Sequence, residues 1–399
     1  MIIRPKTRGF VCVTAHPDGC AQHVQEQIDF VQQHKSIERG PKRSLIIGAS
    51  TGYGLASRIV SAFGCGASTF GVFYERPTSN GRPASAGWYN MAAFTEKAKA
   101  AGLYAGNING DAFTEEIRSQ TIQRIKEEMG PVDEVIYSLA APRRTDPQTG
   151  ETYKSVLKPV GQDFTAKTVD TDKDVVHDVH IEAATEDEIE STRKVMGGED
   201  WVLWIEALSE AGLLADGCQT VAYSYIGPKV TWPVYRDGTI GKAKEHLYQT
   251  AHELNQRMQS KGGRAMVSVN KAVVTQASSA IPVVPLYLSA LIRILSENNL
   301  DEDCIHQIHR LYSEHLYADS PLRLDEENRV RMDDIELRED IQLRIEKLWP
   351  ELNTENLREW TSYDTYKAAF LKLFGFGLSG VDYDADVSEQ RDIPDHVNP

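Results

Sequence analysis

The residues best suited to proton transfer are tyrosines and a lysine in the stretch AYSYIGPKVTWPVYRDGTIGKAKEHL. Tyr235 and Lys244 are separated by eight residues, and Gly238 and Gly241 permit a turn before a helix that we expect to begin near Gly241. Lys244 would then lie in the first turn of that helix. An ammonium close to a phenol lowers the pKa of the phenol, so this pair is suited to protonating an oxygen that gains negative charge. The alternative is an ordinary surface tyrosine and lysine.

Tyr225 and Lys229 form a second candidate pair, with the Tyr-x-x-x-Lys spacing that short-chain dehydrogenases place on one helix face. Gly227 and Pro228 lie between them, and proline removes a helical hydrogen bond while its ring clashes with the preceding turn. We therefore reject Lys229 as the partner of a catalytic tyrosine. Tyr225 itself remains a candidate phenol.

A glycine-rich turn, GASTGYG, follows an apolar run and precedes a helix-like stretch. Gly48, Gly52 and Gly54 would allow a tight turn at a strand end and bring bare backbone close to an anion. The N-terminus of the next helix favours a pyrophosphate there, and Ser50 and Thr51 can add hydroxyl donors. This pattern indicates a dinucleotide site, with a plain glycine-rich turn as the alternative.

Two carboxylates follow the next two predicted strands. Glu75 lies about twenty residues beyond Gly54, where a carboxylate accepts hydrogen bonds from ribose hydroxyls and repels a 2′-phosphate. This favours NADH over NADPH, whereas the neighbouring Arg76 is a group that a 2′-phosphate would seek. Asp111 could accept the adenine amino group while the Ala112 amide meets a ring nitrogen. A helix N-cap explains Asp111 equally well.

These candidates need a framework that brings strand ends together. Short apolar runs alternate with longer amphipathic stretches, which predicts a parallel sheet covered by helices on both faces. We predict strands at Ser44–Ile47, Ser68–Tyr74, Tyr104–Ile108, Glu134–Ser138, Thr220–Ser224 and Ala265–Val269. We predict helices at Gln25–Lys35, Leu55–Phe63, Phe94–Ala101, Glu115–Glu128 and Lys242–Gln259.

Two polar stretches interrupt this alternation, at about residues 76–90 and 140–184. Their length marks them as insertions, either on the substrate side of the sheet or as solvated surface excursions. Past residue 301 the chain is charged, and we expect a helical C-terminal extension over about 301–399. We interpret residues 1–399 as a single α/β domain with a Rossmann-type, doubly wound parallel sheet.

The composition excludes several classes of protein. The chain of 399 residues has a formal net charge of −15 and no dense Lys/Arg block, which argues against nucleic-acid binding. Five scattered cysteines fit free thiols in a cytosol better than a disulfide framework. The longest apolar stretch contains two prolines and is shorter than the ~20 residues of a membrane span. We expect a cytoplasmic protein without a signal peptide.

Several longer motifs occur in order along nearly the whole chain, from AHPDGC to GVDYDADV. Between them lie GASTGYGLA, GWYN, INGDAF, YSLAAPRRTDP, KVMGGEDW, YSYIGPK, YRDGTIGKAK and NKAVVTQASSAIPVVPLY. This set closely resembles the FabV-type enoyl-acyl carrier protein reductases and the related trans-2-enoyl-CoA reductases. The resemblance implies NADH-dependent reduction of the trans-2 double bond of an enoyl thioester in fatty acid synthesis. It also implies a monomer that needs no metal and takes thioesters of acyl carrier protein or coenzyme A.

The resemblance further implies roles for individual residues. Tyr235 would be the proton donor, Lys244 a cofactor-binding lysine, and Tyr225 a substrate-binding phenol near the thioester carbonyl. Glu75 would discriminate against NADPH. The implied cofactor contacts are Gly48, Ala49, Ser50, Thr51, Gly52, Tyr53, Tyr74, Glu75, Asp111, Ala112, Leu139, Ala140, Lys244, Val273, Val274 and Thr275.

Two other functions remain compatible with the individual residues. A carbonyl reductase of the short-chain dehydrogenase type would use the same tyrosine and lysine to reduce a ketone. A nucleotide sensor would bind the dinucleotide without turnover. Oxidation of NADH on adding crotonyl-CoA would exclude the sensor.

Some further residues have chemical potential that we assign to structural roles. We expect His246 to face solvent, and the apolar run AIPVVPLYLSALI to form an acyl-pocket wall or lid, with a core helix as the alternative. Cys12, His16, Cys20 and His23 could together bind zinc, but their spacing does not match common zinc sites. Asp382, Asp384 and Asp386 resemble the start of a calcium-binding loop, but the glycine that such a loop requires is missing.

Overall fold

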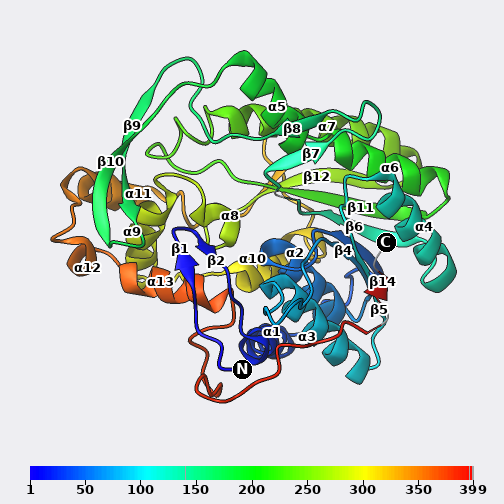
Figure 1. The fold of residues 1–399 in the computed structure, drawn as a ribbon. Helices are drawn as coiled ribbons and strands as arrows, with labels where there is room; N and C mark the ends of the chain where they lie inside the picture. The colour runs from blue at the N-terminus through cyan, green and yellow to red at the C-terminus, as the bar shows by residue number, and fades with distance from the viewer. Residues whose placement is uncertain (140, 395, 398–399) are drawn as a thin grey trace.

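The computed structural model describes residues 1–139, 141–394 and 396–397 (Figure 1). Within these residues the central sheet has eight strands in the order β13-β12-β11-β6-β3-β4-β5-β14, and every neighbouring pair is parallel. The chain builds β3, β4 and β5 toward one edge and then returns to place β6, β11 and β12 on the other side of β3. This reversal confirms the doubly wound fold, and such sheets bind ligands at the carboxyl ends of the strands beside the reversal. The strands are β3 (Arg43–Ile47), β4 (Ser68–Phe73), β5 (Ala105–Asn109), β6 (Val132–Tyr137), β11 (Leu214–Ser224), β12 (Arg264–Val269), β13 (Arg329–Arg331) and β14 (His396–Val397).

Helices cover both faces of the sheet, as predicted (Figure 1). On β3, Ile46 faces one hydrophobic core while Leu45 and Ile47 face the other, as expected for a strand buried on both sides. The first core includes α1 (Pro17–Gln32), α2 (Gly52–Ile59), the π-helical η1 (Val60–Gly64), α3 (Ala86–Ala100), α10 (Cys304–Arg310) and the π-helical η3 (Leu311–Leu316). The second includes α4 (Glu115–Glu128), α6 (Glu199–Glu210) and α7 (Thr239–Met258), which continues into the 3-10 turn η2 (Gln259–Lys261).

The predicted insertions contain more regular structure than expected. Residues 141–184 form two antiparallel hairpins, and α5 (Glu186–Met196) follows them. The stretch predicted at about 76–90 is shorter, because α3 already begins at Ala86. The hairpin strands are β7 (Arg143–Thr145), β8 (Thr152–Lys154), β9 (Phe164–Asp170) and β10 (Val175–Ile181), and a further hairpin near the N-terminus joins β1 (Thr7–Arg8) to β2 (Val11–Cys12).

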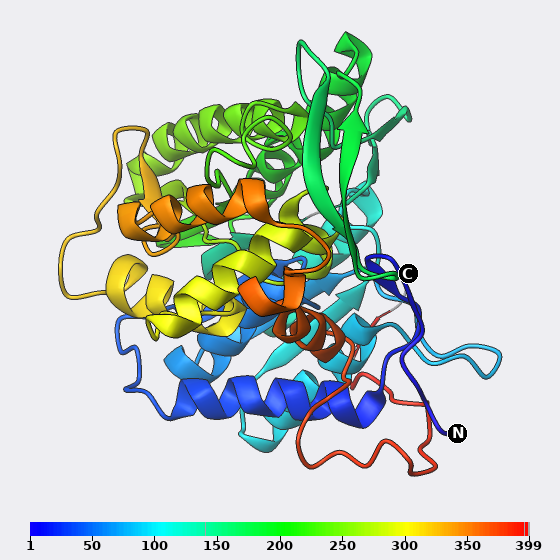
Figure 2. The same ribbon diagram turned by 90° about the vertical axis from the view of Figure 1, so that its left-hand side faces the viewer.

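The C-terminal region is mainly helical, as predicted, and it also contains two short strands. Its strands β13 and β14 extend the central sheet at opposite edges. Its helices α11 (Glu339–Leu348) and α13 (Tyr363–Lys372) pack beside the buried helix α9 (Val284–Glu297) (Figure 2). Most of the run AIPVVPLYLSALI lies in α9, so the core-helix alternative describes it better than an acyl-pocket wall. The elements are α8 (Gln276–Ser279), α9 (Val284–Glu297), α11 (Glu339–Leu348), the 3-10 turn η4 (Trp349–Glu351), α12 (Leu357–Trp360) and α13 (Tyr363–Lys372).

All six predicted strands occur, with boundaries that differ by a few residues, and α4 matches its prediction at both ends. The interpretation of the whole chain as one domain stays a prediction. In the described ranges, no helix is both long and apolar enough to cross a bilayer. All five cysteines are free thiols.

Candidate active site

The glycine-rich turn lies where β3 leads into α2, at the point where the strand order reverses. Gly48 has a positive φ of 88°, which an L side chain rarely adopts. A Cβ on Gly54 would lie 1.9 Å from the Gly48 carbonyl oxygen, so the packing of helix against turn requires glycine there. Thr51 is the N-cap residue of α2 but makes no side-chain capping bond. The first N–H groups of the helix can therefore receive an anion, and the turn fits a dinucleotide pyrophosphate.

Glu75 stands beside this turn, as predicted from its position after β4. Ser50 Oγ donates to Glu75 Oε1 at 2.6 Å, and the backbone N–H of Glu75 donates to Asn109. Burial raises the pKa of the Glu75 carboxyl. Arg76 turns away and donates to the Pro83 carbonyl at 2.9 Å. The structure thus presents a carboxyl group, with Arg76 engaged elsewhere, next to the glycine-rich turn.

The segment around Asp111 lies at the end of β5. Asp111 Oδ1 accepts the Phe113 N–H at 3.0 Å, while Thr114 is the N-cap residue of α4. Asp111 therefore stabilises the turn that precedes the helix cap. Ala112 is buried, and its carbonyl accepts a hydrogen bond from Trp204 at 3.2 Å. Contact of either residue with adenine stays a prediction.

Residues from two distant segments close over the turn. Leu139 has a methyl carbon 3.2 Å from where a Cβ on Gly48 would lie, and the Thr275 methyl lies 3.8 Å from the corresponding position on Gly52. Tyr53 donates to the Lys271 carbonyl at 2.7 Å. Val273 and Val274 precede Thr275 in the same loop, so the structure brings these predicted cofactor contacts together. Tyr74 is 75% exposed, and Ala140 lies outside the described residues.

The two candidate phenols contact each other. Tyr225 directly follows β11, and Tyr235 lies in the irregular turns before α7. Their ring centroids are 4.8 Å apart at an interplanar angle of 81°, an edge-to-face contact. Burial raises the pKa of both phenols, and the charge of Glu336 adds to this effect at Tyr225. Within the described residues, the Tyr235 hydroxyl makes no hydrogen bond, whereas Tyr225 donates to Glu336 at 2.8 Å.

Lys244 is bonded to the end of β11, two residues before Tyr225. Its Nζ donates to the Tyr223 carbonyl at 3.0 Å, and the Tyr223 ring lies 5.6 Å from the ring of Tyr53. Burial lowers the pKa of Lys244 to about 8. The expectation that Lys244 lowers the pKa of Tyr235 is wrong for this structure, because burial dominates at the phenol and the ammonium is bonded elsewhere. Helix α7 also begins earlier than predicted, at Thr239, so Lys244 lies in its second turn.

The sequence profile described as the trans-2-enoyl-CoA reductase catalytic region matches residues 82–317. The chain belongs to the trans-2-enoyl-CoA reductase family. The profile of this family's NAD(P)H binding domain matches residues 2–80, and a profile described as an enoyl reductase FAD binding domain matches residues 324–387.

Two curated relatives of this trans-2-enoyl-CoA reductase family member are named as NADH enoyl-[acyl-carrier-protein] reductases. The protein from Opitutus terrae is 58% identical and that from Saccharophagus degradans 56%, and each match covers 97% of this chain and 98% of the relative. The crystal structure of Treponema denticola trans-2-enoyl-CoA reductase in complex with NAD is 48% identical, with a TM-score of 0.94 over 98% of both chains.

The residues of 324–387 do not fit a flavin dinucleotide. In this family member the segment's strand, β13, runs into an acidic turn that contains Asp333, Asp334 and Glu336. Asp333 and Asp334 already pair with Arg331 and Arg310, so the cations beside this turn are engaged by carboxylates rather than available to a pyrophosphate. The glycines of the segment follow α13, and one of them, Gly375, packs against α1. The turn at residues 48–54 has the features that a dinucleotide requires, and 324–387 lacks them.

Glu336 is the functional candidate that the sequence did not indicate. It is fully buried and its carboxyl group binds Tyr225, although it lies in a charged stretch that we expected to be helical. No spacing or motif connects residue 336 with residue 225. A buried carboxylate in an acidic segment cannot be distinguished from solvated neighbours by composition.

The rejected candidates have structural roles. Gly227 has a φ of 73°, so no helix connects Tyr225 to Lys229. His16 caps α1 by accepting the Gly19 N–H, and Asp384 and Asp386 pair with Arg4 and the N-terminal ammonium.

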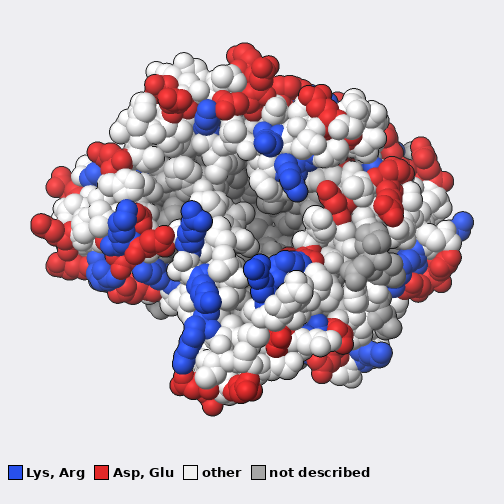
Figure 3. Space-filling view, viewed as in Figure 1, with Lys and Arg blue, Asp and Glu red and all other residues white. Residues whose placement is uncertain are grey.

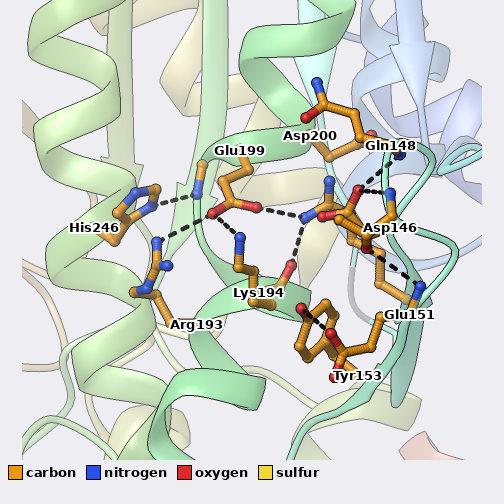
Figure 4. A network of polar contacts seen from close by, with 12 residues as sticks. Asp146, Gln148, Glu151, Tyr153, Arg193, Lys194, Glu199, Asp200 and His246 are labelled. Carbon is orange, nitrogen blue, oxygen red and sulfur yellow. Dashed lines mark hydrogen bonds and ion pairs between the residues drawn. The ribbon is translucent and has the colours of Figure 1, made fainter.

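The expectation that His246 faces solvent is wrong. His246 is half-buried, and its Nδ1 accepts the Gly198 N–H at 3.0 Å (Figure 4). Burial lowers the pKa of the imidazole, which favours the neutral form that can accept this bond. Glu199, which follows Gly198 in the chain, is bonded to Arg144, Arg193 and Lys194. This network holds α5, α6 and the β7 hairpin together.

Charge is distributed unevenly around the site. Figure 3 shows a hollow at the centre of this face, over the region where Figure 1 places α8, with lysine and arginine side chains on both sides of it. Acidic side chains spread over the outer surface. An acidic protein thus presents cations where an anionic ligand would approach.

Proposed function

We propose that this protein reduces the trans-2 double bond of enoyl thioesters with NADH. The observation that carries the proposal is the convergence of the Tyr225–Tyr235 pair with Lys244 and the glycine-rich turn at the carboxyl end of the sheet. The names of the relatives support the same reaction over a carbonyl reduction of the short-chain dehydrogenase type.

The proposed cofactor contacts follow from the placement of the residues. The N–H groups at the start of α2 would bind the pyrophosphate, and Glu75 would accept hydrogen bonds from the adenosine ribose. Val273, Val274 and Thr275 would meet the nicotinamide side, and Lys244 the other ribose. NADH, when bound, supplies the hydride that reaches the β-carbon of the substrate.

Tyr235 is the proposed proton donor. As the β-carbon is reduced, electron density moves to the thioester carbonyl oxygen, which needs a hydrogen-bond donor in the transition state. The Tyr235 side chain is largely buried, its hydroxyl makes no hydrogen bond within the described residues, and the raised pKa of the phenol keeps its proton in place until charge develops. Tyr225 would contact the substrate beside it.

The substrate would approach through a groove of about 470 Å³ next to the Tyr235 turn. Its lining includes Lys229, Val230 and Pro233, together with Phe164 of β9 and Trp349 of η4. This mixture of cationic and apolar groups suits a phosphopantetheine arm, which acyl carrier protein and coenzyme A share. Comparison of kcat/KM for C4 to C12 thioesters of both carriers, with NADH and NADPH in parallel, would separate the two.

Two coarser properties complete the proposal. We propose a cytoplasmic location, which the free thiols support, and a monomeric state, which rests on the family resemblance. Light scattering on the purified protein at several concentrations tests the monomer.

The variant Tyr235→Phe tests the reaction itself. We expect it to lower kcat by about 10²- to 10³-fold, because one oxyanion donor contributes ~2.7–4 kcal/mol, while the Kd for NADH is unchanged. Oxidation of NADH on adding crotonyl-CoA measures the first, and fluorescence titration the second. A near-normal kcat would contradict the assignment.

A further inference from the structure

Glu336 reaches the site from the C-terminal region, between β13 and α11. Its side chain is fully buried. Oε1 accepts the hydroxyls of Tyr225 at 2.8 Å and Tyr287 at 2.6 Å, and Oε2 accepts the Ala272 N–H at 2.7 Å. The carboxyl group therefore joins the end of β11, the helix α9 and the loop that continues to Thr275.

The backbone of Glu336 is fixed as well. Gln342, in the first turns of α11, donates through Nε2 to the Glu336 carbonyl at 2.6 Å, and Leu337 N–H donates to the Asp333 carbonyl at 2.9 Å. A carboxyl group held at both its backbone and its oxygens has little freedom. The phenols that donate to this carboxyl group are therefore restrained in position as well.

Burial of a carboxylate is costly unless its oxygens are satisfied, and three donors meet that requirement here. Stability alone does not explain why one of the three donors is a phenol that lies edge-to-face with Tyr235. A phenol also has a single proton. While the Tyr225 hydroxyl donates its hydrogen bond to Glu336, Tyr235 is the phenol that can donate its proton to the substrate.

We propose that Glu336 is a positioning residue for the reduction: it fixes the Tyr225 phenol, and Tyr225 in turn fixes the ring of Tyr235 against the reacting oxygen. This proposal rests on the proposed function. The segment 324–387 thus contributes a carboxyl group to the reductase site, where a flavin would have required a phosphate-binding turn.

The test is a double-mutant cycle between Glu336→Gln and Tyr225→Phe. An amide at residue 336 offers one acceptor oxygen, so it cannot serve the two phenols and the Ala272 N–H together. We expect Glu336→Gln to lower kcat by about 10- to 100-fold, as misplacement by a fraction of an ångström does, with the Kd for NADH unchanged. In a Tyr225→Phe background, which has already lost the bond, the same change should alter kcat by less than about threefold.

Glu134→Gln is the matched control. Glu134 is also a fully buried carboxyl group that accepts from a tyrosine, Tyr317 at 2.8 Å, but it lies near the amino end of β6. It should lower the melting temperature without changing kcat. If Glu336→Gln reduces the yield of folded protein, Glu336→Asp, which withdraws the carboxylate by one methylene, is measured in the same cycle.

Equal loss of kcat from Glu336→Gln in both backgrounds would overturn the proposal, as would a wild-type kcat in the single variant. Failure of the proposed function itself is distinguishable, because wild-type protein would then not oxidise NADH with any enoyl thioester.

Discussion

Lys244 shows how burial can tune one residue for cofactor binding. Within the described residues, its ammonium donates one hydrogen bond, to the Tyr223 carbonyl at 3.0 Å, and forms no ion pair with a carboxylate. Burial alone lowers its pKa to about 8. A second partner, such as a ribose hydroxyl, would therefore be bound by a cation that is partly withdrawn from water.

This placement predicts how the binding of NADH depends on pH. A lysine with a pKa of about 8 is charged below that pH and loses its charge as the pH rises through it. We expect the Kd for NADH to rise above pH 8, by up to about tenfold per pH unit, when measured by fluorescence titration. Lys244→Arg, which stays charged throughout, should remove this rise. The same pH profile in both proteins would show that Lys244 is not the titrating group.

At the scale of secondary structure, the glycine-rich turn depends on close approach between β3 and α2. We expect Gly54→Ala to lower the free energy of unfolding by about 1–3 kcal/mol and to weaken NADH binding, because its methyl group would overlap the Gly48 carbonyl. Urea unfolding and NADH titration measure the two effects.

Gly102→Ala serves as the comparison. Gly102 differs from Gly54 in having a positive φ, of 72°, and no atom lies within 4 Å of its added Cβ. Gly102→Ala should lower the free energy of unfolding and leave the Kd for NADH unchanged. Equal NADH affinity in the Gly54 and Gly102 variants would mean that the turn does not hold the cofactor.

The sequence predicted these elements unequally. The strands from Ser44 to Val269 were identifiable because apolar runs alternate with amphipathic helices, and Gly48, Glu75 and Asp111 follow from their places at strand ends. The strands β13 and β14 were missed because they have three and two residues, too few for a periodic pattern. Glu336 was missed because its partners are distant in sequence, and only the packed chain brings them together.

At the scale of the whole molecule, a carboxylate in the turn of the β9–β10 hairpin binds side chains of the C-terminal helices, in addition to bonds from Lys167 and Val176 to the segment 349–354. Asp174 lies in the turn between β9 and β10, and its carboxylate accepts hydrogen bonds from Arg358, Tyr363 and Lys367. The bond from Lys367 is the main reason that the pKa of Asp174 falls to about 2. Phe164 of this hairpin and Trp349, near α12, line the proposed substrate groove, so these bonds hold the groove in shape.

Asp174→Asn tests the bonds of this carboxylate and keeps a residue type that tolerates the positive φ of 57° at this turn. Because the folded pKa is below its usual value of 3.8, the stabilisation is present above about pH 4 and is lost as the pH falls toward 2. We expect the variant to lose about 1 kcal/mol of unfolding free energy at neutral pH, and less in acid, by urea unfolding.

Asp319→Asn is its control, because the Arg39–Asp319 pair is largely exposed and should contribute little. An equal loss in both variants, or the same loss at every pH, would contradict a specific role for Asp174.

Glu336 lies after β13 in the chain, and this position affects the order in which the nascent enzyme gains its two abilities, cofactor binding and catalysis. The glycine-rich turn, both phenols and Lys244 all belong to the part of the chain that leaves the ribosome first, whereas residue 336 emerges after α9 and α10. A nascent chain could therefore acquire an affinity for dinucleotide well before it could use it. Competence for chemistry would be the later property, acquired when β13 and the carboxylate that follows it dock onto the sheet.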